Sequence, residues 1–325
     1  MARTAQTYPR LVGDIGGTNA RFAWLAAEGA PLTDIDTLPA AAHPSLLDAI
    51  RHYLARHGKP APRWCAIGIA NPIVGDQVKM TNHDWSFSIS DMKSQLGLDR
   101  FLVINDFTAL ALSLPAMQPG ELRQVGGGTA VPGAPLGLLG AGTGLGVSGL
   151  LPAGGGHRSI PIEGEGGHVT LAATNEREEQ VIAALRRRFG HASAERAVSG
   201  QGIENVYQAL CELAGATPAA WDAAEITRRG TAGEDAHCVE VMDLFFAFLG
   251  TVAGNLALTV GARGGVYIGG GIVPKLGDAI DRSRFRRNFE AKGRMSIYVR
   301  AIPTFVVQAR ISPALTGAAQ SLQEL

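Results

Sequence analysis

The sequence predicts two related α/β lobes, and three observations favour this fold class. A strand, a glycine-rich turn and a second strand occur near the start of each half, at residues 11–25 and 136–151. Hydrophobic residues make up 46% of the 325 positions and charged residues only 18%, so the chain can bury a large core. Glycine occurs 42 times, which indicates many turns and close backbone approaches.

Short apolar runs predict the strands of the first half, at residues 11–15, 20–25, 65–70 and 101–104. Residues 16–19 join the first two strands as a hairpin turn. Residues 45–57 carry apolar side chains at helical spacing, which predicts a helix. A second helix is predicted over 106–114, because Pro115 stops it.

The second half repeats this pattern, with strands predicted at residues 136–139, 146–151 and 265–269. Between them lies a helix with clear ends. Asn175 is its predicted N-cap, glutamates fill its first turn, arginines fill its last turn, and Gly190 ends it. We assign this helix to the scaffold.

A run of nineteen uncharged residues, 244–262, is long enough to be a membrane span, with Gly250 and Gly254 at GxxxG spacing. The alternative is a buried helix whose small residues allow close packing. We favour the buried helix, because the glycine-rich stretch 126–156 is a poor membrane helix and nothing else has membrane character.

Charge and cysteine content narrow the partners and the compartment. Lys and Arg number 29, as do Asp and Glu, so no net charge attracts a nucleic acid or an anionic membrane. The basic cluster 282–294 is better interpreted as a solvated amphipathic helix. Cys65, Cys211 and Cys238 form no CxxC pair, which is typical of a reduced, cytoplasmic chain, and the N-terminus has no apolar signal segment.

The first motif that indicates chemistry is Asp14-Ile-Gly-Gly-Thr-Asn19. Glycine backbone N–H groups and a hydroxyl or amide suit a phosphate. Asp14, at the end of the preceding strand, suits Mg²⁺ through a water. The alternative is a plain hairpin turn with an Asx cap.

The second motif, Gly140-Ala-Gly-Thr-Gly-Leu-Gly146, matches neither GxGxxG nor a Walker A loop. It remains a phosphate-type turn with Thr143 as a hydroxyl donor. Three further glycines, at 269–271, follow a predicted strand and allow close approach of a ring or a sugar. Their alternative role is tight packing of a helix start on the sheet.

Polar residues in two other places could contact a substrate. Asp106 follows a strand and precedes a helix, where a carboxylate can accept a proton from a hydroxyl, although an N-cap explains it equally well. Glu165 and His168, in Glu163-Gly-Glu-Gly-Gly-His168, and Glu195 suit sugar hydroxyls. A metal site is the weaker alternative, since no HExxH helix accompanies them.

Taken together, these motifs resemble the bacterial glucokinase family, the branch of the hexokinase/actin/Hsp70 superfamily that lacks the zinc motif of repressor-related sugar kinases. The resemblance covers nearly the whole chain in order. It rests on residues 11–23, 81–85 (Thr-Asn-His-Asp-Trp), 104–109 (Ile-Asn-Asp-Phe-Thr-Ala), 140–146, 163–168, 194–196 with Ser199-Gly200, and 265–275.

The resemblance implies a two-lobed α/β fold of the actin/hexokinase type, a duplicated ribonuclease H-like fold with an interlobe cleft. The small lobe would comprise 1–116 and 312–325, and the large lobe 117–311. It implies phosphorylation of D-glucose at the 6-hydroxyl by Mg-ATP in a cytoplasmic homodimer. The implied catalytic base is Asp106. The implied sugar ligands are Asn105, Glu165, His168 and Glu195. The implied site for ATP and Mg²⁺ comprises Asp14, Gly16, Gly17, Thr18, Asn19, Gly142, Thr143, Gly270 and Gly271, with the metal held by Asp14 through water.

Two other functions compete with this interpretation. One is a non-catalytic sugar sensor on the same scaffold, which would usually carry a DNA-binding appendage. Only ten residues precede the first predicted strand, so we expect no helix-turn-helix there. The other is a kinase for a different hexose, which only the resemblance disfavours.

Overall fold

A computed structural model describes residues 7–81, 83–153, 159–309 and 311–323 of the chain. By their contacts they form two compact units, the first from the described parts of 1–117, 156–163 and 309–325, and the second from 118–155 and 164–308. Strand β11 (Ile160–Glu163) falls in the first unit, whereas the sequence analysis places it in the large lobe. The predicted lobe limits themselves stay a prediction. Asn82, part of one quoted motif, lies outside the described residues.

The first unit contains a five-stranded sheet in the order β3-β2-β1-β4-β7, with β1 at Arg10–Ile15, β2 at Asn19–Leu25, β3 at Thr33–Pro39, β4 at Trp64–Ile69 and β7 at Arg100–Asn105. Strands β1 and β2 pair antiparallel as a hairpin, and β1, β4 and β7 run parallel. The four predicted strands of this half are therefore confirmed. The edge strand β3 was not predicted, because its residues are mostly exposed or half-buried and carry little apolar signal.

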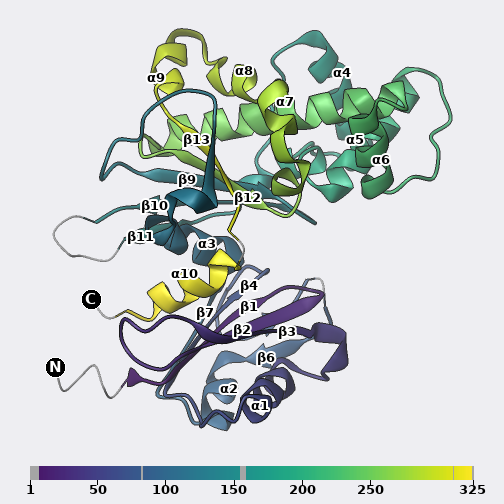
Figure 1. Cartoon of the computed structure of the whole chain (residues 1–325). Helices are drawn as coiled ribbons and strands as arrows, with labels where there is room; N and C mark the ends of the chain where they lie inside the picture. The colour runs from purple at the N-terminus through teal and green to yellow at the C-terminus, as the bar shows by residue number, and fades with distance from the viewer. Residues whose placement is uncertain (1–6, 82, 154–158, 310, 324–325) are drawn as a thin grey trace. The chain divides into compact units, whose positions relative to one another are not determined.

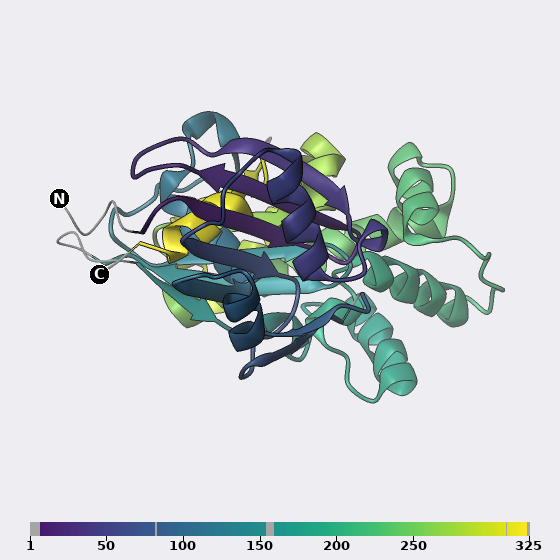
Figure 2. The same cartoon turned by 90° about the horizontal axis from the view of Figure 1, so that it is seen from below.

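Helices cover both faces of this sheet (Figure 1). They are α1 (Leu46–Arg56), α2 (Ile89–Gln95), α3 (Asp106–Ser113) and α10 (Pro313–Ser321), with a separate strand pair β5 (Gln77–Lys79) and β6 (Ser86–Ser88) and the 3-10 turns η2 (Ala40–Ala42) and η3 (Leu114–Ala116). Figure 2, seen from below, shows α1 and α2 in front of the strands. Ser45 caps α1, since its side chain accepts the Asp48 N–H.

Side chains of successive strand residues enter different cores, as the two-residue period of a strand requires. Leu11 and Ile15 pack in the core that contains Ile50 of α1. Val12, between them, packs in a second core with Leu315 of α10. A sheet with two buried faces explains why its central strands are continuous apolar runs.

Helices α3 and α10 cross at a point where only glycine fits. A Cβ placed on Gly317 would lie 1.6 Å from the carbonyl oxygen of Ala109. The close crossing buries Ala109, Gly317 and Ala318. It fixes the C-terminal helix against the helix that begins at Asp106.

The second unit contains a sheet in which five strands lie in the order β10-β9-β12-β13-β8, with β8 at Leu122–Val125, β9 at Leu136–Ala141, β10 at Leu145–Leu151, β12 at Val266–Gly270 and β13 at Thr304–Val307. Strands β9 and β10 form an antiparallel hairpin, and β9, β12 and β13 run parallel. The first unit has the same order of an antiparallel hairpin followed by parallel strands. The predicted relation between the halves is therefore confirmed.

The second unit carries most of the helices. They are α4 (Glu176–Phe189), α5 (Gly200–Leu213), α6 (Ala223–Ala232), α7 (Ala236–Val260), α8 (Phe285–Glu290) and α9 (Ser296–Arg300), with 3-10 helices η4 (Pro119–Glu121), η5 (Gly166–His168), η6 (Ala194–Arg196), η7 (Val273–Arg282) and η8 (Gly293–Met295). The predicted ends of α4 are confirmed, because Asn175 accepts the Glu178 N–H and Gly190 follows with φ +75°.

Helix α7 contains most of the uncharged run that resembled a membrane span. Among the described residues it is the one helix long and apolar enough to cross a membrane, and 78% of its most apolar window is buried inside the protein. Cβ atoms on Gly250 and Gly254 would lie 2.1 and 2.5 Å from the carbonyl oxygens of Phe285 and Phe289. The two glycines therefore let α8 pack directly on α7, which is the buried-helix alternative.

The basic segment around α8 is amphipathic. Phe285 and Phe289 are fully buried, while Arg286 pairs with Glu290 at 2.6 Å. Arg282 pairs with Asp278, and Arg284 pairs with Asp243. Three arginines of the segment, Arg282, Arg284 and Arg286, are therefore engaged in ion pairs within the protein. All three cysteines are reduced and buried.

Candidate active site

The first glycine turn lies between β1 and β2. The Gly16 N–H donates to the Asn19 carbonyl at 2.9 Å and closes the turn. The Thr18 carbonyl accepts the Ala40 N–H at 2.8 Å, which ties the turn to the next segment. Thr18 is exposed, and Gly16, Gly17 and Asn19 are half-buried. The predicted phosphate-type turn is thus a tethered loop whose tip faces outward.

Asp14 lies one residue before the end of β1, and two side chains hold its carboxylate. Arg21, directly opposite it in the antiparallel register, donates to Oδ2 at 3.1 Å. Ser312, just before α10, donates its hydroxyl to the same oxygen at 2.6 Å. Among the described residues both side-chain bonds of Asp14 end on Oδ2, so Oδ1 can accept from a water.

Asn105 and Asp106 lie where β7 ends and α3 begins. The structure assigns the N-cap to Asn105, whose Oδ1 accepts the N–H groups of Phe107 at 2.8 Å and Thr108 at 3.3 Å. Asp106 is the first helical residue, and its Oδ1 also accepts the Phe107 N–H, at 2.9 Å. The idea that Asp106 serves as the cap is therefore wrong, since the residue before it fills that position.

The second glycine turn lies between β9 and β10. The Gly142 N–H donates a hydrogen bond to the Gly144 carbonyl at 2.8 Å and closes the turn. The Gly142 carbonyl accepts a second hydrogen bond, from the Gly200 N–H at 2.8 Å, which attaches the turn to the start of α5. Thr143 is exposed at the tip.

Three of the predicted sugar ligands lie on or next to two short 3-10 helices that pack together, η5 and η6. Glu165 precedes η5 and His168 ends it, and both side chains are exposed. Glu195 lies on η6, and its Oε2 accepts the Leu145 N–H of the second glycine turn at 2.9 Å. Ser199 donates to the Glu195 carbonyl at 2.8 Å and fixes the backbone there. The second unit thus brings Glu195 to the glycine turn.

The third glycine run serves packing at one residue and lines a cavity at another. Gly270 has φ +77°, and a Cβ there would lie 2.4 Å from the Ala141 carbonyl oxygen. The Ile272 N–H donates to that same carbonyl at 3.1 Å. A Cβ on Gly271, by contrast, would meet no atom within 4 Å. Close packing on the sheet therefore explains the glycine at position 270, whereas at position 271 there is space for a ligand to approach the backbone.

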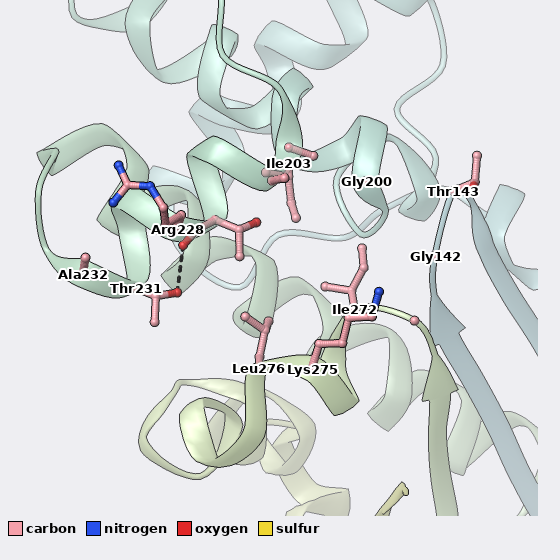
Figure 3. Close-up of a pocket in the computed structure, with 14 residues that line it drawn as sticks. Gly142, Thr143, Gly200, Ile203, Arg228, Thr231, Ala232, Ile272, Lys275 and Leu276 are labelled. Atoms are coloured by element: carbon pink, nitrogen blue, oxygen red, sulfur yellow. Dashed lines mark hydrogen bonds between the residues drawn. The ribbon is translucent and has the colours of Figure 1, made fainter. Parts of the chain in front are cut away.

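A cavity of about 720 Å³ lies beside the second glycine turn, within the second unit (Figure 3). Three predicted nucleotide residues line it, namely Gly142, Thr143 and Gly271. Its apolar walls come from α5, η7 and the residue that precedes η7, through Ile203, Ile272 and Leu276. A volume of this order is typical of a small-molecule site.

Sequence reasoning missed the walls of this cavity. Ile203, Thr231 and Leu276 lie on helices whose pattern is that of ordinary amphipathic elements, and no phosphate motif marks them. The available signal was indirect: Ser199-Gly200, at the start of α5, belongs to a motif of the resemblance.

Ion pairs engage Arg228, a residue of α6 that lines the cavity. Hydrogen bonds from Arg228 hold the pKa of Glu225 down at about 2, below its ordinary value of 4.5. Glu225 and Glu234 in turn raise the pKa of Arg228. The Arg228 guanidinium donates to both carboxylates at 2.6–3.0 Å. Its charge is therefore paired with one glutamate on α6 and with another just after the end of α6.

A metal cluster at Glu163, Glu165 and His168 was the alternative function of that segment. Within the ranges that the structure describes, no three His, Cys, Asp or Glu side chains gather as a metal-binding group. Asp14 remains the candidate for a metal held by a single carboxylate.

Two α/β units of one repeated topology, each with a glycine turn within its antiparallel hairpin, are typical of sugar kinases of the hexokinase-like fold. A solved glucokinase structure from an Antarctic psychrotroph is similar over 97% of this chain and 98% of its own, with 36% identity and a TM-score of 0.87.

The family model described as Glucokinase matches residues 11–325. A glucokinase of Aromatoleum aromaticum is 56% identical over 98% of this chain and 96% of its own length. A glucokinase of Chromobacterium violaceum is 52% identical over 98% of this chain and 90% of its own. The chain therefore belongs to the glucokinase family, enzymes that phosphorylate glucose with ATP.

Proposed function

We propose that this enzyme transfers the γ-phosphoryl group of Mg-ATP to the 6-hydroxyl of D-glucose, with Asp106 as the general base. The observation that carries the assignment of Asp106 is the cap. Because Asn105 caps α3, the carboxylate of Asp106 is not needed to start the helix. A carboxylate at the carboxyl end of a parallel strand is placed where open α/β sheets bind ligands.

The proposed roles of the other residues follow their chemistry. Glu165, His168, Glu195 and Asn105 contact the remaining sugar hydroxyls, since carboxylate, imidazole and amide groups can accept or donate as each hydroxyl requires. The two glycine turns, Gly16–Asn19 and Gly142–Thr143, contact the phosphates through backbone N–H groups. Gly270 and Gly271 belong to the adenosine site, and the cavity beside Gly271 supports this assignment.

Asp14 fits a magnesium ion in one particular way. Its Oδ2 is engaged by Arg21 and Ser312, and no second carboxylate joins it in a described metal cluster. One carboxylate oxygen acting through water suits Mg²⁺, which keeps most of its hydration shell and takes other ligands from phosphates. When bound, the ion neutralises charge on the phosphates. We also propose that the enzyme acts in the cytoplasm and as a homodimer, as the family resemblance implies.

A steady-state assay tests the proposal directly. Mg-ATP is offered with glucose, mannose, fructose, galactose or N-acetylglucosamine, and the sugar phosphate formed is measured. We expect glucose to give the highest kcat/KM and glucose 6-phosphate as product. Preference for another hexose would overturn the roles of Glu165, His168 and Glu195. Sugar binding by calorimetry without turnover would contradict the proposed function itself.

A further inference from the structure

The cavity beside the second glycine turn has two chemically different ends. Figure 3 shows Gly142 and Thr143 on one side of it and Arg228, Thr231 and Ala232 of α6 on the opposite side. The apolar side chains of Ile203, Ile272 and Leu276 lie between these ends. A nucleotide whose phosphates contact the glycine turn would therefore direct its base between the apolar side chains and toward α6.

Helix α6 presents a hydrogen-bond acceptor to this cavity. The Thr231 hydroxyl donates to the Thr227 carbonyl one turn earlier, at 2.8 Å (dashed in Figure 3). A hydroxyl has a single proton and two lone pairs, so Oγ1 of Thr231 is left as an acceptor. Thr231 is exposed at the cavity wall.

Arg228, the α6 cation that lines the cavity with Thr231, is already engaged. Nε, Nη1 and Nη2 of Arg228 all donate to Glu225 or Glu234. Breaking these bonds to reach a base would remove the hydrogen bonds that Glu225 and Glu234 accept from Arg228 and leave both carboxylates to Arg229 alone. The α6 end of the cavity therefore favours a ligand that donates a hydrogen bond over one that accepts.

We propose that Thr231 is a specificity-determining residue whose Oγ1 accepts a hydrogen bond from the 6-amino group of adenine. The inference rests on the proposed function and adds the means of nucleotide selection. Adenine carries an N–H donor at position 6, whereas guanine carries a carbonyl acceptor there. The Thr231 hydroxyl could donate to that carbonyl only by giving up its bond to the Thr227 carbonyl, which disfavours GTP.

Two nucleotides that differ at position 6 isolate this contact. Purine riboside triphosphate has hydrogen where ATP has the amino group and is otherwise the same. One neutral hydrogen bond corresponds to about a 3- to 10-fold preference for ATP over this analogue, and GTP should be poorer still. The preference is measured as the ratio of kcat/KM values and, without glucose, as the ratio of Kd values by calorimetry.

Matched variants then assign the preference to one oxygen atom. Thr231→Val keeps the branched shape but removes the acceptor, and we expect the preference for ATP over the analogue to fall to about one. Thr231→Ser keeps the hydroxyl and should keep the preference. Thr227 also lines the cavity, so Thr227→Val tests whether its hydroxyl makes the contact instead; since Thr231 bonds only the Thr227 backbone carbonyl, we expect the preference to persist in this variant. Thr231→Ala removes the hydroxyl without β-branching and serves if the valine variant folds poorly.

The outcomes separate the two proposals. A preference that persists in Thr231→Val and Thr231→Ala, or that is absent from the wild type, overturns the role of Thr231 whatever the sugar activity. Absence of glucose phosphorylation with every nucleotide contradicts the proposed function, while the Kd ratios still decide the role of Thr231.

Discussion

The backbone N–H of Leu145 donates to Oε2 of Glu195 at 2.9 Å, so the second glycine turn and a predicted sugar ligand are built as one structure. Gly144 makes the contact possible, because a Cβ there would lie 2.4 Å from that same oxygen. The phosphate-type turn and the carboxylate on η6 therefore depend on each other's position. A shift of Oε2 of Glu195 would therefore change both the position of the glycine turn and the position of the carboxylate.

We predict that Gly144→Ala displaces the Glu195 carboxylate and raises KM for glucose. A hydrogen bond to a charged group contributes about 1.5–3 kcal/mol, so kcat/KM should fall tenfold or more. Steady-state kinetics with varied glucose measure the effect. Gly120→Ala is the control, because a Cβ at Gly120 meets no atom within 4 Å. A Gly144→Ala enzyme within twofold of the wild type would show that the contact does not matter for glucose.

We predict that Asp106→Asn lowers kcat by about 10²–10⁴-fold, because the amide cannot accept the proton of the 6-hydroxyl. Glucose binding, measured by calorimetry, should persist. Ser45→Ala, which removes the cap of α1 and no proposed site residue, separates folding from chemistry: it should lower the free energy of unfolding by about 1 kcal/mol and leave kcat unchanged. Turnover of Asp106→Asn within threefold of the wild type would exclude Asp106 as the base.

The sequence predicted the framework of both units better than the walls of the site. Hairpins at Gly16–Asn19 and Gly142–Gly144 and the caps Ser45 and Asn175 are local features, so turn and cap chemistry identify them. The sequence left open whether Asp106 caps α3; the cap is the adjacent Asn105, and the sequence could not decide because Asn and Asp both suit that position.

The nucleotide-sized cavity could not be predicted in the same way. Its wall joins side chains from α5, α6, η7 and the residue before η7, and only tertiary packing brings Ile203, Thr231 and Ile272 to one place. The identity of α7 as a core helix had a sequence signal in Gly250 and Gly254, but the partner that covers them, α8, is apparent only in the fold.

We predict that Gly317→Ala destabilises the first unit. The added methyl group would overlap the Ala109 carbonyl, and a backbone atom cannot rotate away as a side chain can. Overpacking typically costs about 1–3 kcal/mol, and a backbone clash belongs at or above the upper end of this range. Urea unfolding measures the change. Thr316→Ala, at the neighbouring half-buried position of α10, should stay within about 0.5 kcal/mol of the wild type. Equal stabilities of the two variants would mean that α3 and α10 can separate freely.

The last prediction concerns the pH dependence of the ion pairs on α6. Arg228 holds the pKa of Glu225 at about 2, so the carboxylate loses its proton more readily in the folded chain than in the unfolded chain. Its stabilising contribution is therefore fully present above about pH 4.5 and is lost as the pH falls toward 2. Because the pair is exposed, salt should weaken it. Carbon-13 NMR of the Glu225 carboxyl should show no titration step near pH 4.5 in the wild type. In Arg228→Met the step should move back toward 4.5, since the principal hydrogen-bond donor is gone. A wild-type step near 4.5 would mean that Arg228 is not held by Glu225, and the guanidinium would then be available to the cavity beside it.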